Sequence, residues 1–295
     1  MSRDAYDHEP ERESRKPAAP AKGRDAEVVV RRLPAPERGD DRGQGHAQVR
    51  TQDREHEPVG RYRLSRDELE TLRDIGRFRV VNTEDLQRFR YPGNGEAARR
   101  DLGSLRAHGL LKQCALLERG RKSSVVVLTK EGKRLLGKDS GLPSGQAIYA
   151  GLVKPREAPH DAAIYRMYQA EAAAIRARGG TIRRVVLDYE LKRKIYAPLA
   201  KDRPRLKPAQ YARRQAEVAA ANGLDVVNGK IPLPDLRIEY QTREGKLTKV
   251  DLELATDHYK RSQINEKASA GFVVYSEGGG ARPEDRDFMS EILSL

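Results

Sequence analysis

The alternation of apolar and polar positions predicts a run of closely spaced helices and strands between about residues 61 and 137. Ser65-Arg66-Asp67-Glu68 has the spacing of a capping box, in which the Ser hydroxyl and the Glu carboxylate each accept a hydrogen bond from a free backbone amide. Apolar residues then recur at helical spacing as far as Gly76, and Asn82-Thr83 caps a short second helix. We expect a third helix over residues 96–108.

Two strands and a short helix complete this run. Residues 110–117 and 123–129 are predicted as a β-hairpin around a charged tip, and Thr129 is predicted to cap a helix over residues 130–136. Three helices, a β-hairpin and a final helix are the order of a winged helix-turn-helix. We therefore assign residues 59–138 to such a domain.

The third predicted helix has the two faces that a helix in the DNA major groove needs. Ala98, Leu102 and Leu105 share one face and are expected to pack on the first two helices. The opposite face is basic and carries small residues, and its candidates for contact with bases or phosphates are Arg99, Arg100, Ser104 and Arg106. The hairpin tip adds three cations suited to phosphate or minor-groove contact, namely Arg119, Arg121 and Lys122. The alternatives are a solvated helix face and a winged helix that contacts protein.

The rest of the chain predicts a second domain, over residues 159–295. Residues 139–158 contain several Gly and Pro and have the composition of a linker. The elements expected beyond it are helix 159–178, strand 182–190, a basic excursion at 191–230, strands 234–241 and 247–255, helix 258–269, strand 271–276 and helix 283–294. The pattern as a whole predicts an α+β fold, with a winged helix-turn-helix followed by an α/β domain.

The distribution of charge points to a polyanionic partner. The chain has a net charge of +13; residues 59–137 and 138–227 each carry +8, whereas residues 1–58 carry −1 and residues 228–295 carry −2. A basic centre fits nucleic acid, because each phosphate that a cation neutralises releases condensed counterions. An Arg-rich composition spread over a solvated surface is the alternative. The segment 1–58 has few large apolar side chains, so we expect a disordered tail.

The excursion at residues 191–230 concentrates positive charge. Its first half is expected to stay extended because of Pro198, Pro204 and Pro208, and residues 209–221 are expected to be helical. Such an arm, with Tyr196 and Tyr211 among its cations, can follow a phosphate backbone and stack on bases. The arm residues that we assign to DNA contact are Lys192, Arg193, Lys194, Arg213 and Arg214. The alternative is a surface insertion whose charge prevents aggregation.

Acidic residues gather on the strand predicted at 247–255. Period-2 alternation puts Lys249, Asp251 and Glu253 on one face, and Asp235 opens the preceding strand. If the two strands pair antiparallel, Asp235 can lie near Asp251 and Glu253. Clustered carboxylates suit Mg²⁺, so these three acids are candidate metal ligands and candidate catalytic residues. An ordinary polar sheet face, with carboxylates paired to nearby cations, is the alternative.

The element order α-β-β-β-α-β and these acids resemble the PD-(D/E)xK nuclease superfamily, which has a restriction-endonuclease-like fold. Pro234-Asp235 matches the PD of that motif, and Asp251 or Glu253 matches the acid of the third strand. The resemblance implies a metal held by the acids and a Lys that orients or activates the attacking water. Neither strand acid is followed two positions later by Lys. The Lys would therefore come from Lys249, Lys260 or Lys267, and we carry Lys267 forward as a catalytic candidate.

A second resemblance covers about residues 62–276. Its motifs are Leu128-Thr129-Lys130-Glu131-Gly132, Pro159-His160-Asp161, Pro234-Asp235, the acid-x-acid-x-x-Thr run of Asp251, Glu253 and Thr256, the downstream Lys267 and an apolar strand ending at Tyr275. Together they resemble the replication-relaxation family of plasmid and other mobile-element proteins. The resemblance implies a bacterial DNA-associated protein. We interpret His160 as a helix-start residue rather than a base.

These features leave three classes of function open. The first is a protein that binds DNA, expected to be duplex, and acts in replication, transfer or regulation of a plasmid or mobile element, with a degenerate nuclease-like domain. The second is a divalent-metal-dependent DNA endonuclease with Mg²⁺ as its cofactor. The third is an adaptor that recruits a replication or conjugation enzyme.

The sequence excludes several other classes. No run of about 18 apolar residues exists, so we expect neither a transmembrane helix nor a membrane partner. Cys114, as the only cysteine, allows no internal disulfide and no Cys-based zinc site. The charged residues 1–10 lack the apolar core of a secretory signal, so we expect a cytoplasmic protein.

Overall fold

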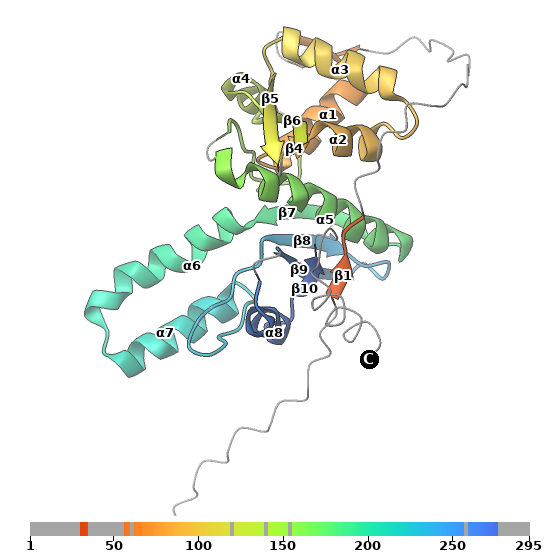
Figure 1. Cartoon of the computed structure of the whole chain (residues 1–295). Coiled ribbons are helices and arrows are strands. Elements are labelled where there is room, and N and C mark those ends of the chain that lie inside the picture. The colour runs from red at the N-terminus through yellow and green to blue at the C-terminus, as the bar shows by residue number, and fades with distance from the viewer. Residues whose placement is uncertain are drawn as a thin grey trace, which may run out of the picture.

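The computed structural model of the chain describes residues 30–34, 56–59, 62–118, 121–138, 141–152, 155–256 and 259–276. Helices and strands both contribute along the chain, so the predicted α+β class is confirmed. Figure 1 shows a helical part and a sheet part, with a long helix between them. Within the described ranges, no helix has both the length and the apolar character needed to cross a membrane.

The helical part, residues 62–138, has the predicted order of elements. These are α1 (Arg66–Arg77), β4 (Val81–Asn82), α2 (Thr83–Arg90), α3 (Gly95–Ala107), β5 (Leu111–Glu118), β6 (Arg121–Leu128) and α4 (Lys130–Leu136). The capping box of Ser65 and Glu68 forms as predicted, and Thr129 caps α4. Strand β4 pairs with β6, which gives an antiparallel sheet of order β4-β6-β5.

The sheet part, residues 158–276, also follows the predicted order. Its main elements are α5 (Ala158–Ala177), β7 (Thr181–Leu187), β8 (Leu236–Gln241), β9 (Leu247–Ala255), α8 (Arg261–Ser269) and β10 (Val273–Ser276). Strands β7, β8 and β9 are antiparallel neighbours, and β10 runs parallel to β9. The helix predicted at 283–294 lies outside the described residues.

A strand from the N-terminal segment completes this sheet. Strand β1 (Val30–Arg32) pairs parallel with β10, so the order is β1-β10-β9-β8-β7. Nearer to the helical part, β2 (His56–Val59) pairs antiparallel with β3 (Tyr62–Ser65). The expectation that residues 1–58 carry no structure is therefore wrong for these two strands. Val30 is buried in a cluster with Val274, a partner that composition alone cannot reveal because it lies at the other end of the chain.

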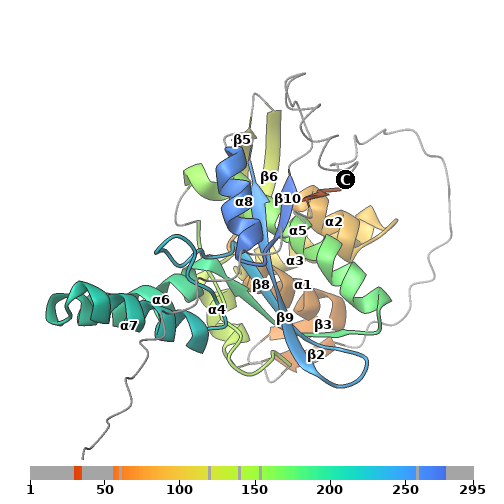
Figure 2. The ribbon, with the colours of Figure 1, turned by 90° about the horizontal axis from the view of Figure 1, so that it is seen from below.

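The basic excursion forms a helical hairpin instead of an extended arm. Its elements are α6 (Asp188–Asp202), the 3₁₀ turn η2 (Arg203–Arg205) and α7 (Pro208–Ala221). Figures 1 and 2 show α6 and α7 side by side, projecting from the sheet.

The expectation of an extended chain was wrong because it gave too much weight to the prolines. Pro198 lies inside α6, whereas Pro208 begins α7, where it costs no helical hydrogen bond. Leu191, Ile195 and Leu199 recur every four residues and are buried in one hydrophobic cluster with Val186 of β7. An apolar stripe of this kind stabilises a helix through tertiary packing, which outweighs the interior proline.

Helix α5 joins the two parts through one hydrophobic core. The ring of Phe78, next to α1, lies 5.1 Å from the rings of both Tyr165 and Tyr168 on α5, measured between centroids. The same cluster of buried side chains extends from Leu72 of α1 to Ile238 of β8. The two parts therefore share a core.

The segment predicted as a linker, residues 139–158, is packed across both parts where the structure describes it. The side-chain amide of Gln146 exchanges two hydrogen bonds of 2.9 Å with the backbone of Val185 on β7. The backbone N–H of Tyr149 donates to the carbonyl of Gly76 at 2.9 Å. Residues 141–152 thus tie α1 to the sheet.

Candidate nucleic-acid interface and acidic site

Helix α3 lies at the end of the molecule opposite the five-stranded sheet (Figure 1), and three of its exposed residues are arginines. Asn94 caps the helix by accepting a hydrogen bond from the Ala97 N–H at 3.0 Å. The buried residues are Ala97, Ala98, Asp101, Leu102 and Leu105, whereas Arg99, Arg100, Gly103, Arg106 and Ala107 are exposed and Ser104 is half-buried. The predicted apolar and basic faces of this helix are confirmed.

The arginines of α3 differ in how firmly they are held. The Arg100 side chain is 58% exposed, and its contact with the buried Asp101 is long, at 3.4 Å. Within the described residues, Arg99 has no ion-pair partner. Arg106 donates to the Gln113 side chain on β5 at 2.7 Å, and Gln113 in turn donates to Ser124 on β6 at 2.7 Å. Arg99 and Arg100 are therefore available to a ligand, while Arg106 links α3 to the hairpin.

Of the three predicted cations at the tip of the β5–β6 hairpin, the structure describes the side chain of one. Lys122 is exposed on β6, opposite Leu117 of β5. Arg119 and the side chain of Arg121 lie outside the described residues.

Two of the predicted acids meet a lysine at one end of the sheet. Asp235 lies just before β8, and its Oδ2 accepts the backbone N–H of Leu254 at 2.9 Å. Lys267 of α8 places Nζ 2.7 Å from Glu253 Oε1 and also donates to the Leu233 carbonyl at 2.7 Å. The antiparallel pairing of β8 with β9 thus brings Asp235 toward Glu253, as predicted, and α8 supplies the lysine.

Glu253 is the most perturbed carboxyl group of this site. It is 1% exposed, and burial together with the charge of Asp235 raises its pKa to about 7, although Lys267 and Tyr259 oppose the shift. The Tyr259 hydroxyl donates to Glu253 Oε1 at 2.7 Å. The second oxygen, Oε2, is buried without a hydrogen-bond partner in the described part of the chain. One oxygen of Glu253 is therefore left without a hydrogen-bond partner among the described residues.

His160 completes this group, although we interpreted it only as a helix-start residue. It is the third residue of α5, and its Nε2 lies 3.6 Å from Asp235 Oδ2. Burial lowers its pKa, but contact with the Asp235 carboxylate raises it more, so the net pKa is raised. The signal that could have found it is the Pro159-His160-Asp161 motif. We name the set of Asp235, Glu253, Lys267, His160 and Tyr259 the acidic site.

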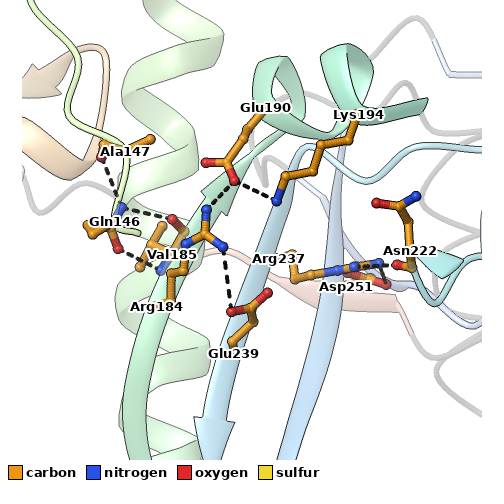
Figure 3. A network of polar contacts seen from close by, with 10 residues as sticks. All are labelled: Gln146, Ala147, Arg184, Val185, Glu190, Lys194, Asn222, Arg237, Glu239 and Asp251. Atoms are coloured by element: carbon orange, nitrogen blue, oxygen red, sulfur yellow. Dashed lines mark hydrogen bonds and ion pairs between the residues drawn. The ribbon is translucent and has the colours of Figure 1, made fainter. Parts of the chain in front are cut away.

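Asp251 faces a different partner. Arg237, its neighbour in the β8–β9 register, donates from Nε to Oδ1 at 2.6 Å and from Nη2 to Oδ2 at 2.9 Å, and Lys249 donates to Oδ2 at 2.9 Å. Figure 3 shows this pair, with the Arg237 guanidinium also on the Asn222 carbonyl. Both side chains are buried. Both oxygens of Asp251 are therefore engaged by cations of the same chain, unlike those of Glu253.

With Asp251 engaged elsewhere, two carboxylates remain as possible metal ligands. Among the residues that the structure describes, no group of three His, Cys, Asp or Glu side chains is arranged to hold a metal ion. The predicted three-carboxylate ligand set therefore does not form.

The start of α6 is held to the sheet by a second polar network (Figure 3). Arg184 of β7 contacts Glu190 of α6 and lies 3.9 Å from Glu239 of β8, and Lys194 lies 3.0 Å from Glu190. This network fixes the direction in which the α6–α7 hairpin leaves the sheet. It also neutralises part of the charge of Lys194, one of the predicted DNA contacts.

The other predicted arm residues are divided between ion pairs and solvent. Lys192 donates to Asp188 at 2.5 Å, and Arg214 pairs with Asp202 at 2.8 Å and Glu217 at 3.2 Å. Arg193 and Arg213 are exposed, and neither has an ion-pair partner within the described ranges. The α6–α7 hairpin keeps positive charge on its surface, but fewer of its cations are free of ion pairs than the sequence suggested.

The fold and these sites define a mixed α+β protein in which a helical part with an exposed basic helix shares its core with a sheet part that bears an acidic site. Residues 72–218, about half of the chain, match the family model described as Replication-relaxation. The chain belongs to the replication-relaxation family, as its motifs indicated. Membership indicates a role in the replication or transfer of a plasmid or other mobile element.

The extent of the match separates the two candidate sites. It runs from α1 to α7 and includes α3, the β5–β6 hairpin and most of the α6–α7 hairpin, but it ends before β8. Asp235, Glu253 and Lys267 therefore lie outside it. Comparisons with curated proteins and with solved structures find no match.

Proposed function

We propose that this protein binds duplex DNA, with α3 in the major groove and the β5–β6 hairpin on the phosphate backbone. The observation that carries the proposal is the division of α3, whose buried face holds Leu102 and Leu105 while Arg99 and Arg100 point away from the core. Arginine can bond to both acceptors of a guanine edge, and Gly103, which lies between Arg100 and Arg106, allows close approach of the helix to the groove.

The order of elements supports the same proposal. Helix α1, strand β4, helices α2 and α3, and the β5–β6 hairpin follow one another as in a winged helix-turn-helix, and β4 joins the hairpin in one sheet. In that arrangement α3 is the reading helix and the hairpin is the wing. The contact between Arg106 and Gln113 connects these two elements, so that both can meet one duplex.

The test is the effect of Arg100→Ala on sequence preference. A duplex selected from a random library and a scrambled duplex of the same length provide the two ligands, with binding followed by fluorescence anisotropy. Loss of one bidentate base contact is expected to lower the preference for the selected duplex about tenfold, with little change on the scrambled duplex. Lys246→Ala, which removes an exposed cation from the β8–β9 turn, is the control. Equal loss on both duplexes for Arg100→Ala would show that this residue does not read bases.

A second function, metal-dependent cleavage of DNA, is favoured by one specific observation at the acidic site. Glu253 keeps Oε2 buried and unpartnered, while Lys267 lies 2.7 Å from its other oxygen. Mg²⁺ is often bound by only one or two carboxylates, with water and substrate phosphate completing its shell, so Asp235 and Glu253 fit such an ion. Bound Mg²⁺ would supply charge stabilisation at a phosphate. Lys267 would hold Glu253 in place, and His160 would carry positive charge beside Asp235.

Nicking of supercoiled plasmid with and without Mg²⁺ tests this second function. Metal-dependent nicking that is lost in both Glu253→Gln and Lys267→Met would support it. Absence of nicking in wild-type protein that binds Mg²⁺ would dismiss cleavage and leave the DNA-binding proposal standing.

A further inference from the structure

Two tyrosines on the outer face of α6 are exposed and lie outside the hydrophobic core. Tyr189 is 61% exposed and Tyr196 is 50% exposed, and they are two of the four large hydrophobic residues that stand exposed in the described part of the chain. They lie seven positions apart, which puts them on the same side of the helix, on a different face from the buried Leu191, Ile195 and Leu199. Exposed aromatic rings aligned on one helix face indicate a surface for a ligand.

Positive charge accompanies these rings. Lys192 and Arg193 lie between the tyrosines on the same side of α6, and both are exposed. Arg193 has no ion-pair partner within the described residues, and Lys192 is held by Asp188 at the base of the helix. An apolar ring next to a free cation is complementary to a ligand that combines flat bases with phosphates.

Helix α6 begins next to a residue of the acidic site. The backbone N–H of Asp188, the first residue of α6, donates to the carbonyl oxygen of Asp235 at 3.1 Å. Asp188 also accepts the hydrogen bond from Lys192. Helix α6, which carries Tyr189, Lys192, Arg193 and Tyr196, therefore starts next to Asp235, and it leads outward as part of the projecting hairpin (Figures 1 and 2).

We propose that the outer face of α6 binds single-stranded DNA, with unpaired bases stacked on Tyr189 and Tyr196 and phosphates on Lys192 and Arg193. The two tyrosines are about 10 Å apart along the helix axis, which a few nucleotides can span. In a duplex the bases stack on one another inside the helix, so the rings of α6 are complementary to unpaired bases. The strand so bound leads to the acidic site. This inference takes DNA as the ligand from the proposed function, but it uses a surface separate from α3.

The test compares single-stranded and duplex binding by the full-length chain. The probes are a fluorescein-labelled oligothymidylate and a labelled duplex, in buffer without divalent metal. Because base stacking on aromatic side chains is sequence-tolerant, a Tyr189→Ala/Tyr196→Ala variant is expected to bind the oligothymidylate about 30-fold more weakly and the duplex unchanged. The matched Tyr189→Phe/Tyr196→Phe variant keeps both rings and is expected to bind like the wild type.

The outcomes separate this inference from the proposed function. Wild-type protein that binds duplex but not oligothymidylate would overturn the inference and leave duplex binding intact. Equal weakening of both ligands in the alanine variant, or no weakening of either, would also overturn it. The protein could also bind the oligothymidylate through the tyrosines and fail to bind duplex DNA. That result would support the inference and contradict the proposed function. Because both tyrosines are exposed, the alanine variant is expected to fold, which unchanged circular dichroism would verify.

Discussion

Lys267 of α8 lies 2.7 Å from Glu253 of β9, so the helix supplies the cation that the strand sequence lacks. Two positions after Glu253 the strand carries Ala255, which is buried and cannot supply a positive charge. The ammonium group also donates to the Leu233 carbonyl, which fixes it at the end of the sheet where Asp235 lies. This carboxylate and this lysine come from different elements, and both side chains are largely buried, so they do not belong to an exposed sheet face.

The raised pKa of Glu253 predicts a specific dependence of stability on pH. The native pKa is about 7 and the ordinary value is 4.5, so between these values the native state binds more protons than the unfolded state. Stability contributed by this group is therefore present at low pH and is lost as the pH rises from about 4.5 to about 7.

Glu253→Gln removes this pH-dependent contribution to stability because glutamine resembles the protonated acid. Relative to wild type, the variant is expected to gain stability between pH 5 and pH 7.5, by up to roughly 3 kcal/mol. Urea denaturation at the two pH values measures the difference. A difference in unfolding free energy that stays constant with pH would contradict the assigned pKa.

The ion pair of Arg237 and Asp251 predicts a structural role for both. Asp251→Asn leaves the buried Arg237 guanidinium with an uncompensated charge and is expected to cost about 3–5 kcal/mol of unfolding free energy. Replacing both partners, as Arg237→Met/Asp251→Leu, is expected to cost less than Asp251→Asn alone. Glu239→Gln, on a half-exposed residue 3.9 Å from Arg184, is the control and is expected to cost under about 1 kcal/mol. A metal-binding role for Asp251 would instead make its substitution nearly neutral in the absence of metal.

The packing of Phe78 against α5 leads us to predict that the helical and sheet parts unfold together. It is 1% exposed and packs against Tyr165 and Tyr168 of α5, which also cover the sheet. Phe78→Ala is expected to lower the free energy of unfolding by about 3–5 kcal/mol. Amide hydrogen exchange should show the same loss of protection in α3 and in β8. Loss confined to the helical part would mean that the two parts fold independently, and Leu247→Ala, at a residue 72% exposed, serves as the neutral control.

The sequence predicted most elements because their signals are local. The capping residues Ser65 and Thr129 and the alternation along β9 each depend on neighbours within a few positions. The partners of Asp251 and Val30 could not be predicted in this way. Arg237 and Val274 meet them only after the strands have paired, and a strand sequence does not encode which cation will reach across the sheet.

The candidate sites were predictable to different degrees for the same reason. The basic face of α3 follows from helical spacing within one element, so the three arginines named in advance stand exposed, while Ser104 is half-buried. The acidic site combines α5, the loop before β8, β9 and α8, and its histidine was found only from the fold. The helical conformation of α6 was missed because Pro198 was given more weight than the four-residue spacing of Leu191, Ile195 and Leu199.

We predict that removing the Lys122 side chain from the β5–β6 hairpin changes the salt dependence of DNA binding but not the preference for one duplex sequence over another. A wing lysine that neutralises one phosphate contributes about one to the slope of log affinity against log salt concentration. Lys122→Ala is therefore expected to reduce the slope by about one and to weaken selected and scrambled duplexes equally. A changed preference between the two duplexes would show that the hairpin contacts bases.

The most direct test of the account is the affinity of the full-length protein for duplex DNA when the exposed arginines of α3 are removed. We predict that the wild type binds duplex DNA, more weakly as salt is raised. Arg99→Ala/Arg100→Ala should bind about tenfold more weakly or worse at the same salt concentration, while Lys246→Ala should stay close to the wild type. Wild-type protein that fails to bind duplex DNA even at low salt, or a double variant that binds as tightly as the wild type, would contradict the claim that α3 is the DNA-binding helix.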